Sequence, residues 1–188
     1  NTTGLLCLSI QFIAGKMMLI RALLLGWKLD VVVPDASPLK NTQKEYDFTA
    51  MVPLQLENSI KYLHLIKTLI VGGGVVSQRL QQKIQNVSCA VFATYGMTET
   101  ITHIAVKKLN NFHTISSGQI KNSYYEVLPD IEIFIDQRNC LVIKSPKISN
   151  HIIFTNDTAQ LISEHQFEWL GRFDTIINSG GVKLHPES

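Results

Sequence analysis

Charged residues are scarce in this chain, and no run of them carries a single sign. Lys and Arg number 17 against 15 Asp and Glu, which leaves a net charge of +2 over 188 residues. Proteins that hold nucleic acid usually present a stripe of basic side chains to the phosphates. The lack of such a stripe argues against nucleic acid as a partner.

Cysteine is also scarce, and its pattern excludes a disulfide framework. Cys7, Cys89 and Cys140 are odd in number, far apart and free of any C-x-x-C spacing, and each lies in an apolar segment. We expect buried free thiols in a protein of the reducing cytoplasm. The six histidines show no metal-ligand spacing either.

No apolar run is long enough to cross a membrane. The most hydrophobic region, 12–29, is interrupted by Lys16, Arg21 and Lys28, and a span needs about 20 residues. This region therefore predicts a buried helix. The first ten residues contain neither a basic leader nor a small-residue cleavage site, so we expect no signal peptide.

The first part of the chain alternates short apolar runs with helical patterns. The predicted strands are 5–10, 29–33, 48–52, 68–71 and 88–94. The predicted helices are 15–25, 53–63 and 77–84. Continuous Val, Ile and Leu strands between helices indicate an α/β fold, with a mostly parallel sheet flanked by helices.

After Leu109 the pattern changes to short strands with a period of two. Ile131, Ile133 and Ile135 alternate with polar or larger residues, and "DQRN" at 136–139 is typical of a hairpin turn. This predicts a small β-meander or barrel-like subdomain. We expect an α/β subdomain at 1–112, the β subdomain at 113–172, and the start of a truncated C-terminal domain at 173–188.

Three glycines follow one predicted strand, in "LIVGGGVVSQRL". Gly72, Gly73 and Gly74 would let the backbone approach a ligand, next to the free amides of a helix N-terminus. A tight turn with Ser77 as the helix N-cap explains the same residues. A dinucleotide-binding G-x-G-x-x-G needs glycine where Ser77 stands, so a nicotinamide dehydrogenase is a remote alternative.

Polar side chains follow another predicted strand, in "VFATYGMTET". A carboxylate between two hydroxyls, at Thr98, Glu99 and Thr100, can hold magnesium and phosphate oxygens at the end of a parallel strand. Tyr95 could present a flat face to a base. The alternative is a plain hairpin turn with Glu99 in solvent.

A third candidate pairs "FTNDTAQL" with "WLGRFD". Asp157 and Arg172, fifteen residues apart, could converge on a ribose, with the carboxylate accepting from its hydroxyls. A surface aspartate in an ordinary salt bridge is the alternative.

These segments, in this order, resemble the adenylate-forming acyl-CoA synthetase superfamily. "TYGMTET" matches the Tyr-Gly-Met-Thr-Glu motif of that family, and "LIVGGG" is similar to its upstream Gly-Gly-Ala segment. "TNDTAQL" resembles its Thr-Gly-Asp motif, and "GRFDTIINSGGVKLHPES" the start of its small C-terminal domain. The resemblance covers nearly the whole chain and implies an AMP-forming acid–thiol ligase, which joins a carboxylic acid to coenzyme A using ATP and Mg²⁺.

The resemblance also implies roles for individual residues. Thr98 would contact the α-phosphate, Glu99 would hold the magnesium, and Asp157 would accept from both ribose hydroxyls with Arg172 nearby. Asp174 would be the hinge between the two half-reactions. The adenine site would be lined by Gly72, Gly73, Gly74, Thr94, Tyr95, Gly96 and Met97, and the loop at Gly180 and Gly181 would approach in the CoA step.

Departures from the family pattern limit these expectations. Asn156 replaces the usual glycine before Asp157, and Phe12 stands where a histidine is frequent. The lysine-bearing phosphate loop and the C-terminal catalytic lysine are absent, so we expect a fragment with little or no ligase activity of its own. Rival hypotheses are another acyl- or aryl-CoA ligase, a carrier-protein adenylation domain, or a non-catalytic nucleotide-binding module.

Overall fold

The computed structural model describes residues 2–111, 123–175, 177–179 and 182–184, in two compact units. The first unit comprises Asn1–Thr94 and Lys108–Ser123, and the second comprises Tyr95–Lys107 and Tyr124–Ser188. The domain limits predicted at residues 112 and 172 stay predictions, because compactness does not establish which segments fold separately.

The first unit is built on a parallel sheet, as predicted. Its strands pair in the order β2-β1-β3-β4-β5. Their bounds are β1 Thr3–Leu6, β2 Lys28–Val31, β3 Tyr46–Met51, β4 Ile66–Val71 and β5 Ala90–Gly96. Each strand begins up to two residues away from its predicted start, which is the usual uncertainty at an element boundary.

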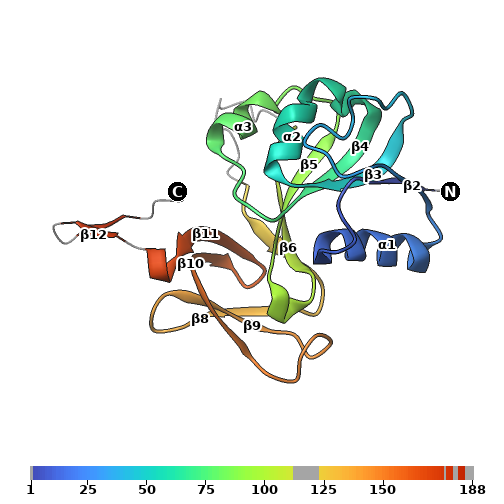
Figure 1. Ribbon diagram of the computed structural model, residues 1–188. Coiled ribbons are helices and arrows are strands. Elements are labelled where there is room, and N and C mark those ends of the chain that lie inside the picture. The colour runs from blue at the N-terminus through green and yellow to red at the C-terminus, as the bar shows by residue number, and fades with distance from the viewer. Residues whose placement is uncertain (1, 112–122, 176, 180–181, 185–188) are drawn as a thin grey trace. The chain divides into compact units, whose positions relative to one another are not determined.

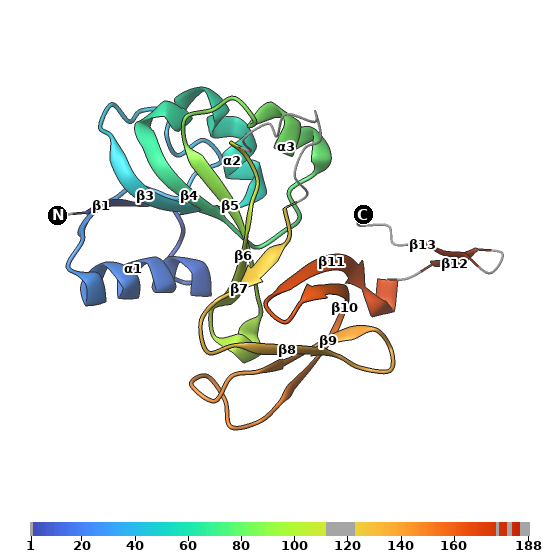
Figure 2. The same cartoon turned by 180° about the vertical axis from the view of Figure 1, so that it is seen from behind.

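Helices cover both faces of this sheet. Figures 1 and 2 show α2 (Pro53–Ser59) and α3 (Gln78–Lys83) on one face and α1 (Ile13–Leu25) on the other. The helix predicted over 53–63 ends early and continues as a 3₁₀ helix, η1 (Ile60–Leu65). Ser77 caps α3 as predicted, because its hydroxyl accepts the amide of Leu80 at 3.3 Å.

The prediction that α1 is a buried helix is wrong for most of its side chains. Only Gly15, Met18 and Ala22 are buried, whereas Leu23 and Leu24 are 72% and 80% exposed. One stripe of a helix can face a sheet, and the remaining apolar residues of α1 lie outside it. None of the helices in the described ranges has the length and hydropathy of a membrane span.

The second unit is an antiparallel sheet, as the alternating pattern predicts. Its strands pair in the order β6-β7-β11-β10-β9-β8. Their bounds are β6 His103–Lys108, β7 Tyr125–Val127, β8 Glu132–Ile135, β9 Cys140–Lys144, β10 Ile153–Ser163 and β11 Gln166–Arg172. Short η3 (Phe173–Thr175) follows, and then the pair β12 (Ile177–Ser179) and β13 (Val182–Leu184).

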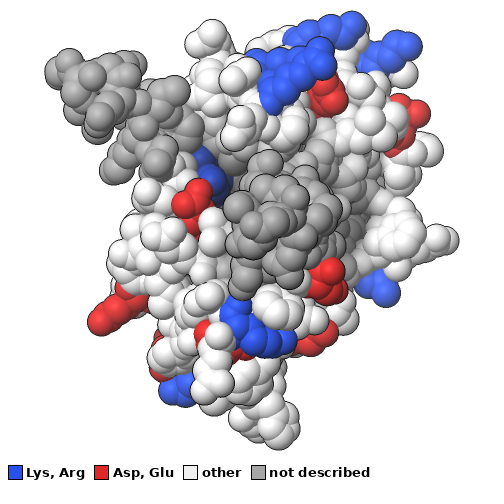
Figure 3. All heavy atoms as spheres, turned by 90° about the vertical axis from the view of Figure 1, so that its left-hand side faces the viewer, with Lys and Arg blue, Asp and Glu red and all other residues white. Residues whose placement is uncertain are grey.

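Burial in the second unit follows the predicted alternation. Ile131 and Ile133 lie in a core with Tyr95 and Phe167, whereas Phe134 is 47% exposed. All three cysteines are buried and free, as expected from their apolar surroundings. Figure 3 shows basic and acidic side chains interspersed on one face, as the balanced charge implies.

Candidate functional site

The glycine turn after β4 lies beside the end of β5 in the first unit. The Gly72 amide donates to the Met51 carbonyl at 3.1 Å, and the Thr94 hydroxyl donates to the Val71 carbonyl at 3.2 Å. A Cβ on Gly72 would stand 2.6 Å from Thr94 Oγ1, and Gly73 has φ 76°. The structure thus brings Gly72 and Thr94 together at the carboxyl end of the sheet, where α/β folds commonly bind ligands. Their contact with adenine stays a prediction.

The turn at 96–102 belongs to the second unit and is held by Thr100. The Thr100 hydroxyl accepts the Met97 amide at 2.9 Å, and its single proton lies within reach of the Met97 and Thr102 carbonyls, at 2.9 and 2.8 Å. A Cβ on Gly96 would lie 2.6 Å from backbone atoms of Thr102 and His103. Of the polar side chains in the motif, Thr100 is therefore the one that builds the turn.

This turn stores backbone strain at Ile101. The residue has φ 62° and ψ −46°, and the Thr102 amide donates to the Thr100 carbonyl at 2.6 Å. These features define a classic γ-turn, which is rare, and a β-branched residue is unfavourable at positive φ. Such strain persists where the surroundings impose it, and it is concentrated at functional sites.

Thr98 and Glu99 have a different environment from Thr100. They lie on the 3₁₀ helix η2 (Thr98–Thr100), where Thr100 is buried and the other two side chains are exposed. Within the described ranges, no hydrogen bond or ion pair holds the Thr98 hydroxyl or the Glu99 carboxylate. Both groups are thus open to a ligand, although the same exposure fits a solvated turn.

Asp157 and Tyr95 form the central polar contact of the second unit. The Tyr95 hydroxyl donates to Asp157 Oδ2 at 2.7 Å, and the two residues are 8% and 7% exposed. Burial, and then the charge of Asp157, raise the pKa of Tyr95, so the phenol stays protonated and keeps donating. The Tyr95 ring contacts the Phe167 ring edge-on, with 5.2 Å between the ring centroids. The stacking of Tyr95 on a base stays a prediction.

Arg172 lies between two carboxylates. Its Nη1 is 3.9 Å from Asp157 Oδ1, and its Nε and Nη2 donate to Asp174 at 3.1 and 3.2 Å. These hydrogen bonds lower the pKa of Asp174. The structure places Asp157 and Arg172 beside each other, together with Asp174. Their convergence on a ribose and the hinge role of Asp174 stay predictions.

A magnesium site formed by the protein alone is not present among the described residues. No three Asp, Glu, His or Cys side chains gather there as a ligand set. Magnesium in nucleotide enzymes is commonly bound by one or two carboxylates together with substrate phosphates. The open carboxylate of Glu99 fits that kind of site. Gly180 and Gly181, predicted for the CoA step, lie outside the described residues.

Two further residues contribute to the surroundings of Asp157 and were not predicted from the sequence. Arg138, in the hairpin turn, donates to Asn156 and to the Thr155 carbonyl, next to Asp157. Thr155 accepts the Asp157 amide through its hydroxyl at 3.0 Å. A threonine two residues before an aspartate is a recognisable local signal. Arg138 gives no comparable signal, because its partners are 17 and 18 residues away.

Known structures share this fold. An AMP-forming acyl-CoA synthetase/AMP-acid ligase II-like protein from Dyadobacter fermentans matches with a TM-score of 0.82 and 36% identity, over 98% of this chain and 53% of that one. The O-succinylbenzoate coenzyme A synthetase of Bacillus subtilis, solved with ATP and magnesium, matches with a TM-score of 0.79 and 20% identity, over 98% and 44%.

One curated protein is similar in sequence. The 2-succinylbenzoate–CoA ligase of Lactococcus lactis is 26% identical over an alignment of 157 residues, and the match covers 75% of this chain and 34% of that protein. No protein-family model matches. The chain thus spans between about a third and about half of the length of these relatives.

Fold, motif order and sequence agree on the class of protein. The chain is related to the adenylate-forming acyl-CoA synthetases, and the resemblance expected from its motifs is confirmed. The particular enzyme that recurs among the relatives is O-succinylbenzoate–CoA ligase, found in the curated match and in solved structures from two bacteria.

Proposed function

We propose that this chain holds the adenine nucleotide in an AMP-forming acid–CoA ligase. The observation that supports this most is the buried Asp157 carboxylate, which the Tyr95 hydroxyl holds through Oδ2 while Oδ1 lies 3.9 Å from Arg172. A buried charge is costly unless it is paired, so a carboxylate kept in this position suggests a role in binding. Asp157 accepts the two ribose hydroxyls in this proposal.

The exposed turn supplies the phosphate side of the same proposal. Thr98 donates to the α-phosphate, and Glu99 ligates magnesium together with phosphate oxygens. When bound, magnesium neutralises the charge on the phosphates. The acid carboxylate attacks the α-phosphorus and pyrophosphate leaves; the CoA thiol then displaces AMP from the acyl-adenylate. Asp174 acts as the hinge between these steps, and the loop at Gly180 and Gly181 serves the second.

The acid we propose is O-succinylbenzoate. The named relatives support this, since ligases of this acid recur among them. The segment "IAGKMMLIRAL" at 13–23 adds weaker support, because it is similar to those ligases. Fatty acids, aryl acids and acids carried to a carrier protein are the alternatives.

Isothermal titration with AMP tests the nucleotide role. Asp157→Asn should weaken AMP binding at least tenfold, because a hydrogen bond to a charged acceptor contributes about 1.5–3 kcal/mol. Asp130→Asn is the matched control, since Asp130 forms an exposed ion pair with Lys147 in the same unit. Equal AMP affinity in all three proteins would refute the proposal.

Pyrophosphate exchange tests the acid. In the ligase that contains this chain, O-succinylbenzoate should stimulate ATP–pyrophosphate exchange more than fatty or aryl acids do. Stimulation by another acid alone would retain the nucleotide role and replace the substrate. AMP binding without exchange on any acid would indicate a non-catalytic nucleotide-binding module.

A further inference from the structure

We propose that Arg138 is a positioning residue for Asp157, acting through the backbone of β10 and through Asn156. This inference rests on the proposed function, in which Asp157 binds the ribose. Arg138 does not touch Asp157. It lies in the turn between β8 and β9 and fixes the two residues that precede the carboxylate along the chain.

The guanidinium is first oriented by its own turn. Asp136 accepts the backbone amides of Arg138 and Cys140 at 2.8 and 2.9 Å, and its carboxylate also accepts Arg138 Nε at 2.9 Å. The carboxylate therefore closes the turn and orients the side chain together. An exposed ion pair contributes little stability alone, so the consequence of this pairing is orientation.

From that position Arg138 reaches β10. Its Nη1 donates to Asn156 Oδ1 at 3.0 Å, and its Nη2 donates to the Thr155 carbonyl at 2.9 Å. The guanidinium also lies 5.6 Å from the centre of the Phe173 ring, next to Arg172 in sequence. One planar group with five donors thus joins three segments of the second unit, which a single-point cation could not do.

The segment that Arg138 holds is irregular. Phe154 pairs with Val142 and Thr158 pairs with Cys140, so β10 advances four residues (154 to 158) while β9 advances two (142 to 140). Residues 155–157 therefore bulge from the ladder, and bulges re-aim side chains next to functional sites. Thr155 is only 4% exposed, and its carbonyl receives the Arg138 hydrogen bond within this bulge.

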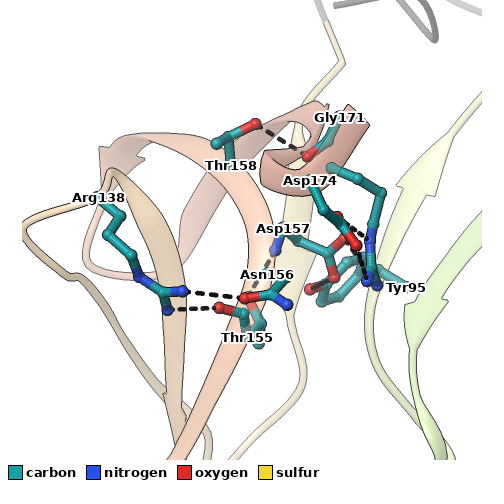
Figure 4. Close-up of polar contacts among 9 residues, drawn as sticks. Tyr95, Arg138, Thr155, Asn156, Asp157, Thr158, Gly171 and Asp174 are labelled. Atoms are coloured by element: carbon teal, nitrogen blue, oxygen red, sulfur yellow. Dashed lines mark hydrogen bonds and ion pairs between the residues drawn. The ribbon is translucent and has the colours of Figure 1, made fainter. Parts of the chain in front are cut away.

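The bulge directs Asp157 toward Tyr95. Figure 4 shows Arg138 on one side of residues 155–157 and Tyr95 on the other. The Asp157 amide donates to Thr155 Oγ1 at 3.0 Å, so a displacement of Thr155 also displaces the backbone that carries the Asp157 carboxylate. Asn156 stands where the family pattern has glycine, and its side chain is one of the two acceptors that β10 offers to Arg138. Arg138 and Asn156 thus act as a pair that stabilises the bulge.

The test compares AMP with 2′,3′-dideoxy-AMP, which lacks the hydroxyls that Asp157 would bind. Arg138→Met should weaken AMP binding about tenfold and leave dideoxy-AMP binding unchanged, so the affinity ratio of the two ligands collapses. Arg138→Lys should behave like Arg138→Met, because the hydrogen bonds to Asn156 and to the Thr155 carbonyl need two donors in one plane, which a lysine ammonium does not provide. Lys144→Met, an exposed ion-pair residue on β9, is the control and should keep the wild-type ratio.

Asn156→Ala gives a second variant that should fold, since Asn156 is exposed. It should reduce AMP affinity about threefold. In the double variant it should add little to the effect of Arg138→Met, because both changes remove the same hydrogen bond between Arg138 and Asn156. Folded Arg138 variants that keep the wild-type affinity ratio would overturn the positioning role. A loss for both ligands by the same factor would also overturn it, since that indicates a general structural role.

A ligand-free measurement separates this inference from the proposed function. By NMR, Arg138→Met should shift the Asp157 amide and the Tyr95 ring resonances, whereas Lys144→Met should leave them in place. Unshifted resonances would overturn the positioning role whatever the protein binds. Shifted resonances together with equal wild-type affinity for AMP and dideoxy-AMP would refute the ribose role of Asp157 and support the positioning.

Discussion

Gly96 and Gly74 are both motif glycines, but their surroundings differ. A Cβ on Gly96 would lie 2.6 Å from backbone atoms of Thr102 and His103, whereas one on Gly74 would make an ordinary 3.5 Å contact with Pro53. Backbone cannot move aside as a flexible side chain can. The glycine in "TYGMTET" is therefore required by the turn itself, independently of any ligand.

Gly96→Ala should lower the free energy of unfolding by about 1–3 kcal/mol, the usual cost of overpacking. Gly74→Ala should change it by less than about 0.5 kcal/mol. Urea denaturation followed by circular dichroism measures both. Equal stability of the two variants would show that the turn at 96–102 relaxes without cost.

At the scale of the element, α1 shows that an apolar residue of a helix is not necessarily buried. Met18 is 1% exposed and packs with Leu6 and Ala50 against the sheet, while Leu24 on the same helix is 80% exposed. The composition of the segment does not show which of these residues is buried. Burial depends on which face of the helix packs against the sheet.

Met18→Ala should destabilise the protein by about 2–4 kcal/mol, because it removes apolar atoms that are buried away from water and leaves a cavity in their place. Leu24→Ala should cost less than about 0.5 kcal/mol, since alanine also favours helix. Chemical denaturation provides the comparison. A large loss for Leu24→Ala would mean that its side chain is covered in solution.

At the scale of the whole molecule, buried thiols give stability a dependence on alkaline pH. Burial raises the pKa of the Cys7 thiol from 9.0 to about 11, against a smaller lowering by the Thr49 hydrogen bond. The unfolded chain therefore loses this proton first as the pH rises. The stability associated with the protonated thiol is complete below pH 9 and is lost as the pH rises through about 11.

Between pH 9 and 11, the free energy of unfolding should fall by roughly 2–3 kcal/mol more in the wild type than in Cys7→Ala. Comparing the two proteins cancels the contributions of other groups that titrate there. Denaturant titrations at fixed pH values measure the difference. Parallel stability curves for the two proteins would contradict the prediction.

Local patterns in the sequence predicted most of the elements, although not β6, β12 or β13. Val- and Ile-rich runs, Ser77 before a helix and alternation around Ile133 depend on neighbours a few residues away, so their reading agrees with the structure. The motifs likewise indicated Asp157 and Arg172 as partners, since both lie at recognisable positions. The domain limits and the roles of Thr98 and Glu99 stay predictions.

What only the tertiary structure decided is which long-range partners those residues have. Tyr95 and Asp157 are 62 residues apart, and their hydrogen bond depends on the packing of the second unit. The hydrogen bond from Arg138 to Asn156 depends on the irregular register between β9 and β10. Strand register and bulges arise from the packing of whole faces, which no short stretch of sequence contains. The sequence by itself determined most of the elements and the candidate residues; the fold decided which side chains hold Asp157 in place.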